Sequence, residues 1–281
     1  MPDPGRLLTT IARAVDATRR QPGRRGRLID LAGADDLLIA GDLHGHLGNF
    51  QMLYKAADLV NNPRRHLVLQ EVVHGKFRYP NGGDKSHQII DLYCAMKIQF
   101  PDRVHLLMGN HEIAQWTGRP VIKGDEDLNH LFIDGLRQAY GERHREIESA
   151  YFDLFAVLPL AIRTGNRVFL SHSLPTPKNR PLFSLEHLMR DEHPEEDYAP
   201  KGPLYSLVWG RDVSAENTAE FLKLVDCDFL VTGHIPCDHG FTTPNEQQVI
   251  IDSCSSPAAY MLLPANGALN RHTFYAGVRL I

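Results

Sequence analysis

The stretch LLIAGDLHG, residues 37–45, decides how the rest of the chain is interpreted. Four apolar residues run directly into a glycine, and Asp42 and His44 follow. A short apolar run that ends in glycine and polar residues is typical of a buried strand. The two polar side chains are therefore expected at the carboxyl end of a strand.

Five further apolar runs repeat this pattern. They are HLVLQE (66–71), VHLLMGN (104–110), RVFLSH (167–172), DFLVTGH (228–234) and QVIIDS (248–253). The runs are continuous rather than alternating, which indicates strands covered on both faces. Helical patterns lie between them, for example over residues 47–57 and 89–96. Strands that alternate with helices predict an α/β sandwich.

Five of the six runs end in a side chain that can bind a metal ion. These are Asp42, Glu71, Asn110, His172 and His234, and His44 lies two residues past the first. Ligands of open α/β sheets bind outside the carboxyl ends of the strands. Carboxylate, imidazole and amide ligands together suit manganese, iron or zinc. Two such ions need a bridging group, for which the Glu71 carboxylate is the candidate.

Composition excludes several classes of function. The 281 residues are 43% hydrophobic, enough for one full-sized domain over residues 1–281. A formal charge of −4 offers no field for anionic partners, so neither a nucleic-acid nor a membrane partner is expected. Four cysteines without CxxC spacing and the lack of a run of ~20 apolar residues predict a soluble, cytoplasmic protein.

Three segments outside these strands are assigned separately. Residues 1–30 are expected to form a helical extension, and residues 125–158 are expected to be mostly helical. The segment 175–204 is rich in proline and charge, which predicts a lid loop. Together with residues 113–130, this loop is expected to shape the mouth of the site.

Four motifs carry a resemblance to a known family. They are GDLHG (41–45), GNHE (109–112), LSHS (170–173) and TGH (232–234), and LVWGRD (207–212) follows the third. Over residues 37–263 the chain resembles the calcineurin-like metallophosphoesterases, in the branch of serine/threonine protein phosphatases and bacterial diadenosine tetraphosphatases. The resemblance implies a metallophosphoesterase-type β-sandwich of two mixed sheets flanked by helices, with metals at the carboxyl ends of the strands.

The resemblance also implies roles for individual residues. The first metal would be held by Asp42 and His44, the second by Asn110, His172 and His234, with Glu71 between them, and His111 would protonate the leaving group. The implied reaction is hydrolysis of a phosphate ester, in a phosphoprotein or a nucleotide, by a metal-activated water. The catalytic group would be His111, Asp42 and His74.

The second motif departs from the family pattern. The family reads GDxxDRG, whereas residues 70–76 read QEVVHGK. Glu71 keeps a carboxylate, but His74 replaces the aspartate that orients His111, which predicts weaker control of the His111 tautomer. The phosphate-binding arginine is missing, and Arg78 and Arg211 are candidate replacements.

Two alternatives stay open at this point. His74 is either the partner of His111 or itself a metal ligand, since it lies three residues past Glu71. The protein is either a phosphoesterase or a catalytically impaired pseudophosphatase that binds phosphorylated ligands.

Overall fold

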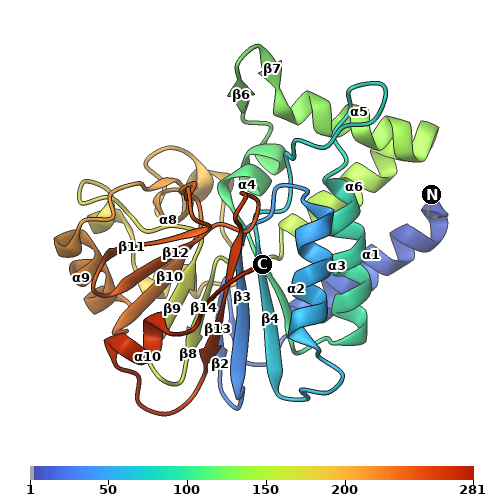
Figure 1. Ribbon diagram of the computed structural model, residues 1–281. Coiled ribbons are helices and arrows are strands. Elements are labelled where there is room, and N and C mark those ends of the chain that lie inside the picture. The colour runs from blue at the N-terminus through green and yellow to red at the C-terminus, as the bar shows by residue number, and fades with distance from the viewer. Residues whose placement is uncertain (1–2) are drawn as a thin grey trace.

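Two β-sheets stand at the centre of the computed structural model, which describes residues 3–281 (Figure 1). The larger sheet has the strand order β1 (Arg24–Arg25), β2 (Leu28–Leu31), β8 (Ala161–Thr164), β9 (Val168–Ser171), β10 (Phe229–Thr232), β12 (Gln248–Ile251) and β11 (Phe241–Asn245). The smaller has the order β14 (Val278–Leu280), β13 (Ala259–Pro264), β3 (Asp36–Asp42), β4 (Arg65–Gln70) and β5 (Val104–Leu107). Both sheets contain parallel and antiparallel pairs, so both are mixed.

An apolar cluster joins the two sheets. Leu37 and Ile39 of β3 belong to the same buried cluster as Leu170 of β9 and Val231 of β10. Continuous apolar strands supply side chains to both of their faces, and one face of each sheet is covered by the other sheet. The β-sandwich of two mixed sheets that the resemblance implied is confirmed.

Helices cover the outer faces of the sandwich (Figure 1). The longer ones are α1 (Pro4–Arg19), α2 (Leu47–Ala57), α3 (His87–Gln99), α4 (Asn110–Thr117), α5 (Leu128–Tyr140), α6 (His144–Phe155) and α9 (Ala215–Leu224). The shorter ones are η1 (Gly141–Arg143), η2 (Arg180–Leu182), α7 (Leu185–Leu188), η3 (Glu195–Tyr198), α8 (Ser206–Trp209) and α10 (Arg271–Tyr275). α5 and α6 confirm the helical prediction for residues 125–158.

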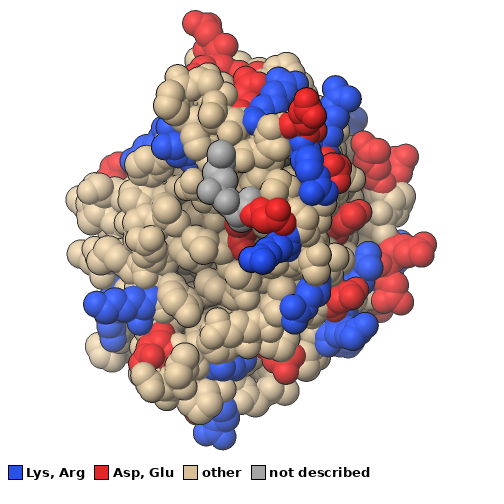
Figure 2. All heavy atoms as spheres, turned by 90° about the vertical axis from the view of Figure 1, so that its right-hand side faces the viewer, with Lys and Arg blue, Asp and Glu red and all other residues tan. Residues whose placement is uncertain are grey.

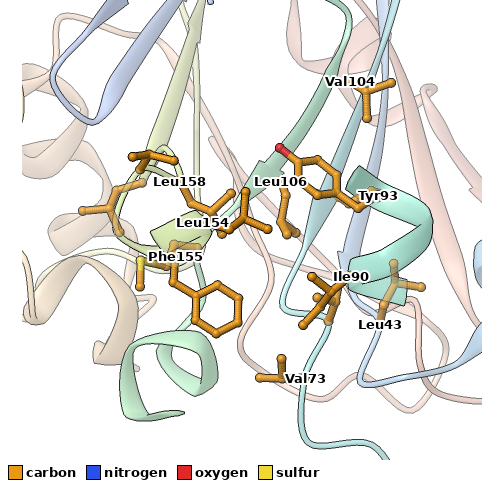
Figure 3. Close-up of a cluster of buried hydrophobic side chains, with 14 of the residues drawn as sticks. Leu43, Val73, Ile90, Tyr93, Val104, Leu106, Leu154, Phe155 and Leu158 are labelled. Carbon is orange, nitrogen blue, oxygen red and sulfur yellow. The ribbon is translucent and has the colours of Figure 1, made fainter. Parts of the chain in front are cut away.

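A second apolar cluster lies between the helices and the sheets and positions two loops (Figure 3). Leu43, Val73 and Ile90 are buried in it. Leu43 precedes His44, and Val73 precedes His74. Packing of the two apolar residues therefore holds the two histidines in place.

The helical extension expected over residues 1–30 is wrong in its second half. Helix α1 packs against α3 and α6, but β2 is part of the larger sheet, with Leu28 opposite Ala161 of β8. Leu28, Ile29 and Leu31 are buried there, so apolar burial gives this short stretch a place in the sheet. Residues 1 and 2 lie outside the described residues.

The lid expected over residues 175–204 is not an open loop. It contains η2, α7 and η3, and Phe183, Leu188, Tyr198 and Leu204 are buried. These four apolar side chains anchor the segment to the core. The prolines and charged residues correctly indicated a segment without long helices or strands. The buried apolar residues between them pack the segment against the core.

The hairpin of β6 (Ile122–Lys123) and β7 (Glu126–Asp127) projects near α4 and α5 (Figure 1). On the face where α1 lies, charged side chains of both signs are interspersed (Figure 2). Within residues 3–281, no helix combines the length and the apolar character needed to cross a bilayer.

Candidate metal centre

The carboxyl ends of strands from both sheets meet at one site. Asp42 ends β3, and it pairs in an isolated bridge with Asp252, which follows β12. The backbone N–H of His234, 192 positions further along the chain, donates to Asp42 Oδ1 at 2.9 Å. A Cβ on Gly233 would lie 2.3 Å from the same oxygen, so only glycine permits this approach. The convergence predicted from the strand ends is present.

Glu71 lies at the middle of the predicted ligands. Its side chain is buried, with Oε1 3.3 Å from His44 Nε2 and Oε2 3.1 Å from His172 Nε2. Oε2 also accepts from the His111 backbone N–H at 3.0 Å. The carboxylate therefore spans the space between a residue assigned to the first metal and one assigned to the second.

Gly109 provides the room for this longer acid. A Cβ at position 109 would lie 2.2 Å from Glu71 Oε2 and 2.8 Å from Glu71 Cβ. Real contacts of this kind do not occur, so any side chain at position 109 would displace the carboxylate.

Potential ligand atoms form two groups that share one residue. One group is His44, Glu71 and His111, the other is Asp42, Glu71 and His172, and the atoms of each lie within 4.8 Å of one another. Asn110 Oδ1 is 2.9 Å from His172 Nε2, and the His234 ring is edge-on to the His172 ring at 5.0 Å. All six predicted metal ligands are thus brought together.

Two buried nitrogens at this site have no hydrogen-bond partner among residues 3–281. They are His172 Nδ1 and His234 Nε2. Buried polar atoms are normally paired, and an imidazole lone pair is a good ligand for a divalent transition metal. The carboxylate, imidazole and amide donors together fit manganese, iron or zinc.

Four residues of the site have left-handed backbone conformations. The φ angles are 40° at His44, 35° at Glu71, 61° at His74 and 69° at His234. Non-glycine residues seldom adopt such angles, and each costs of order 1–3 kcal/mol. The surrounding packing holds these side chains in directions that relaxed strand ends would not give them.

Burial and mutual charge shift the pKa values of the central groups. Burial raises the pKa of Asp42 to about 6. Burial alone would raise the pKa of Glu71, but the charges of His172 and His111 hold it well below its usual range. For His172, burial would lower the pKa, but the Glu71 and Asp42 carboxylates raise it to about 9. A metal ion bound at this histidine would have to displace that proton.

His74 contacts His111 but belongs to neither group of potential ligands. His74 Nε2 is 2.9 Å from Gln115 Oε1, and His74 Nδ1 is 2.9 Å from His111 Nδ1. An amide oxygen only accepts, so Nε2–H of His74 donates to it and Nδ1 of the neutral ring is an acceptor. His111 Nδ1–H then donates to His74, which leaves His111 Nε2 free to face the site.

This arrangement corrects the expectation about the altered second motif. A histidine replaces the aspartate, yet the His111 tautomer is still set, because Gln115 sets the tautomer of His74. Gln115 was missed from the sequence. Its signal is the spacing of four residues from His111, which puts both side chains on one face of α4. With both nitrogens of His74 occupied, the geometry gives no support to His74 as a ligand.

Glu112 ties the altered motif to the start of α4. Its Oε1 accepts from the backbone N–H groups of Val72 and Val73 at 2.8 and 3.1 Å, and its Oε2 accepts from that of Gly109 at 2.9 Å. Burial raises the pKa of this carboxyl to about 7. Its role is to hold the backbone on either side of Glu71.

A cavity of about 750 Å³ opens over the ligands. Both predicted arginines, Arg78 and Arg211, line it, and so do Lys76 and Lys123. Arg78 Nη2 is 3.6 Å from Glu126 Oε2, and Nη1 is buried without a partner among the described residues. The cavity therefore combines the predicted metal ligands with four cationic side chains, one of which is paired with Glu126.

The lining also contains residues that the sequence reasoning missed. Lys123 lies on the β6–β7 hairpin, within the segment 113–130 expected at the mouth. Asp252 follows β12, so the strand-end signal that identified Asp42 applied to it as well. Among residues 3–281, the cavity lining contains none of the segment 175–204 that was expected to form a lid.

An arginine has no room at position 75, where the family pattern of the second motif would put it. A Cβ on Gly75 would lie 2.4 Å from the His44 carbonyl oxygen. The backbone of the two loops approaches too closely for a side chain, so a phosphate-binding arginine must come from elsewhere in the cavity.

Comparison with known proteins gives consistent relatives. Residues 36–238 match the family model of calcineurin-like phosphoesterases. A probable serine/threonine-protein phosphatase of Encephalitozoon cuniculi is 25% identical, over 84% of this chain and 52% of its own length. The serine/threonine-protein phosphatase 6 catalytic subunit of Caenorhabditis elegans is 26% identical, over 84% of this chain and 71% of its own length. The chain thus spans about half the length of the first of these relatives.

A solved structure has the same fold. A protein serine/threonine phosphatase from Saccharomyces cerevisiae superposes with a TM-score of 0.70 at 18% identity, over 100% of this chain and 90% of that one. At this identity the likeness concerns the fold alone.

Proposed function

Because the chain belongs to the calcineurin-like phosphoesterase family, we propose that it hydrolyses phosphate monoesters at a centre of two divalent transition-metal ions. The observation that supports two ions rather than one is the position of Glu71, which is common to both groups of potential ligands. A carboxylate shared between two sets of donors is what a bridged pair of metals requires.

The ligands are assigned as the resemblance to the family implied, because the contacts alone place Asp42 in one group with His172 and His44 in the other with His111. Asp42 and His44 would hold one ion, and Asn110, His172 and His234 the other, with Glu71 shared. When bound, the two cations, manganese, iron or zinc, supply charge neutralisation at the phosphate oxygens and a water activated for attack near neutral pH. Asp42 also holds the backbone of His234, so it positions the second group as well as serving the first.

His111 is the proposed general acid. Its Nε2 faces the site, 4.0 Å from Glu71 Oε1, while its Nδ1–H donates to His74. Burial lowers the pKa of His111 to about 3, so the ring of the free protein is neutral at neutral pH. A phosphate dianion beside the ring favours the imidazolium, whose Nε2–H is then the one proton free to reach the leaving oxygen.

Arg78 and Arg211 are the proposed contacts of the substrate phosphate. Both line the cavity, and a guanidinium is suited to bidentate phosphate binding. Arg78 Nη1 is buried and has no hydrogen-bond partner among residues 3–281, so the guanidinium keeps unused capacity for a phosphate oxygen.

We propose a phosphorylated protein side chain as the substrate, since two relatives are named as serine/threonine-protein phosphatases. A phosphorylated nucleotide is the second source of the same chemistry. A cytoplasmic location stays a prediction. The pseudophosphatase alternative is not favoured by these relatives.

The test is turnover by the manganese-loaded chain. We expect hydrolysis of p-nitrophenyl phosphate and of phosphoserine or phosphothreonine peptides, and little hydrolysis of the diester bis-p-nitrophenyl phosphate. His272→Ala, which removes an exposed histidine of α10, is the matched control and should leave turnover unchanged. Two bound metals with no turnover of any phosphate ester would replace this proposal by the pseudophosphatase.

A further inference from the structure

A second cluster of histidines and an acid lies away from the metal centre. His187 in α7, His193 after it and Asp197 in η3 place potential ligand atoms within 4.8 Å of one another. His187 Nε2 is 2.7 Å and His193 Nδ1 is 3.3 Å from the same oxygen, Asp197 Oδ2. None of the three lines the cavity over the metal centre.

The cluster is shielded from water. The side chain of His193 is 1% exposed, that of Asp197 is 11% exposed and that of His187 is 16% exposed. His193 faces Asp197 with its Nδ1, whereas its Nε2, on the other side of the ring, is buried without a hydrogen-bond partner among residues 3–281. A carboxylate and two imidazoles withdrawn from water need strong partners, and two imidazoles that share one carboxylate oxygen leave hydrogen-bonding capacity unused.

The distances suit a tetrahedral ion. Zinc binds imidazole nitrogen and carboxylate oxygen at 2.0–2.2 Å, so neighbouring ligand atoms lie roughly 3.4 Å apart around it. The separation between His193 Nδ1 and Asp197 Oδ2 already has this value, and the separation between His187 Nε2 and Asp197 Oδ2 must open by about 0.7 Å. Two imidazoles with one carboxylate match the borderline softness of zinc.

The sequence around the cluster is rich in acidic residues, and the buried Arg27, which lies over the Tyr198 ring, is an opposing positive charge. Residues 190–197 read RDEHPEED, with five acidic side chains and one arginine. Clustered charge of one sign raises the local concentration of the opposite ion. The same acidic stretch would repel itself as the segment folds, which a bound cation relieves.

We propose that His187, His193 and Asp197 bind one zinc ion, with water as the fourth ligand. This ion holds the segment 185–209 against helix α4 and the metal centre. The Asp197 carbonyl accepts from the backbone N–H groups of Leu204 and Tyr205. Through Asp197, the ion thus connects α7 and η3, which come before Leu204, to α8, which follows it.

The anchored segment contacts both sides of the metal centre. Tyr198 packs edge-on against Trp116 of α4, the helix that carries His111, at 5.2 Å. Trp209 packs edge-on against the ring of His234 at 6.5 Å. The segment therefore contacts the helix that carries His111 and the ring of His234, and the zinc site itself does not rest on the proposed reaction.

The test counts zinc in the full chain. Apo protein is dialysed against micromolar zinc and its zinc content measured by elemental analysis, for the natural chain and for Asp197→Asn, which keeps the shape of the side chain. We expect Asp197→Asn to bind one zinc fewer. His272→Ala, at an exposed histidine of α10, is the control and should bind as much as the natural chain.

A second measurement removes the main centre. The variant with Asp42→Asn and His172→Ala should retain one zinc and melt at a higher temperature when zinc is added, and adding Asp197→Asn should abolish both effects. An anomalous-difference map of zinc-soaked crystals of the natural chain should show a peak between the three residues. Equal zinc content in Asp197→Asn, or no peak at zinc saturation, means that the cluster is held by hydrogen bonds only and overturns the proposal.

Discussion

His74→Asp should increase the rate of phosphomonoester hydrolysis. The Oδ atoms of aspartate and the Nδ1 atom of histidine both lie two bonds beyond Cβ. A carboxylate oxygen at position 74 therefore falls close to the present Nδ1, which is 2.9 Å from His111 Nδ1. The direction of the hydrogen bond is kept, because His111 Nδ1–H donates in both cases.

The gain comes from charge. A carboxylate beside an imidazole raises its pKa by about 1–3 units, equivalent to about 1.4–4 kcal/mol in favour of the imidazolium. Burial now lowers the pKa of His111 to about 3, and His74 adds to this lowering instead of countering it. Partners of this kind change activity by about 10- to 100-fold, and we expect an increase in this range. Gln115 loses its hydrogen-bond partner in this variant, which lowers the stability of the fold.

The assay compares three variants on two substrates. His74→Asn has the shape of aspartate without its charge and should show no gain, whereas His74→Ala should lose about 10- to 100-fold. The effect should be larger on a phenyl phosphate than on p-nitrophenyl phosphate, whose leaving group needs less protonation. The alkaline limb of kcat/KM reports the acid, so His74→Asp should move it to higher pH by about 1–3 units.

Two results would refute this reasoning. Equal rates and equal pH profiles for His74→Asp and His74→Asn would mean that His111 does not respond to charge at position 74. Loss of metal in His74→Ala, measured by elemental analysis, would make His74 a ligand and would require the ring to turn away from Gln115.

Three further predictions concern the metal centre and the core. Glu71→Ala should lose at least one of two metals by elemental analysis, while Glu71→Asp keeps both; full retention in Glu71→Ala would remove the bridging role. Gly109→Ala should lower the urea-derived free energy of unfolding by about 1–3 kcal/mol and weaken metal binding, because its Cβ meets Glu71 Oε2 at 2.2 Å; unchanged metal content would contradict this. Burial, together with Arg103, lowers the pKa of His66 to about 4. The unfolded chain therefore binds one more proton than the folded chain between pH 6.5 and 4, and the free energy of unfolding decreases as the pH is lowered through that window, by up to about 3 kcal/mol. His66→Leu should flatten this acid limb in denaturation curves, and an unaltered slope would place the acid sensitivity elsewhere.

Much of the fold followed from local patterns. The six apolar runs are the strands β3, β4, β5, β9, β10 and β12, with ends shifted by a few residues. Continuous apolar runs have few other solutions, and strands that run side by side bring their carboxyl ends to one edge. Strands β2 and β13 were not predicted, because neither has a strong apolar or turn pattern in its own sequence. Pairing with β8 and with β3, respectively, determines where they begin and end.

By itself, the sequence determined that carboxylate, imidazole and amide side chains would gather at one edge of an α/β sandwich, since that depends only on which residue follows each strand. Only the tertiary structure decided what the altered second motif does. Gly109 makes room for Glu71, and Gln115 directs the hydrogen of His74 so that His111 keeps its tautomer. A ring nitrogen is a donor or an acceptor according to the atom opposite it, and that atom comes from a part of the chain that only folding brings near.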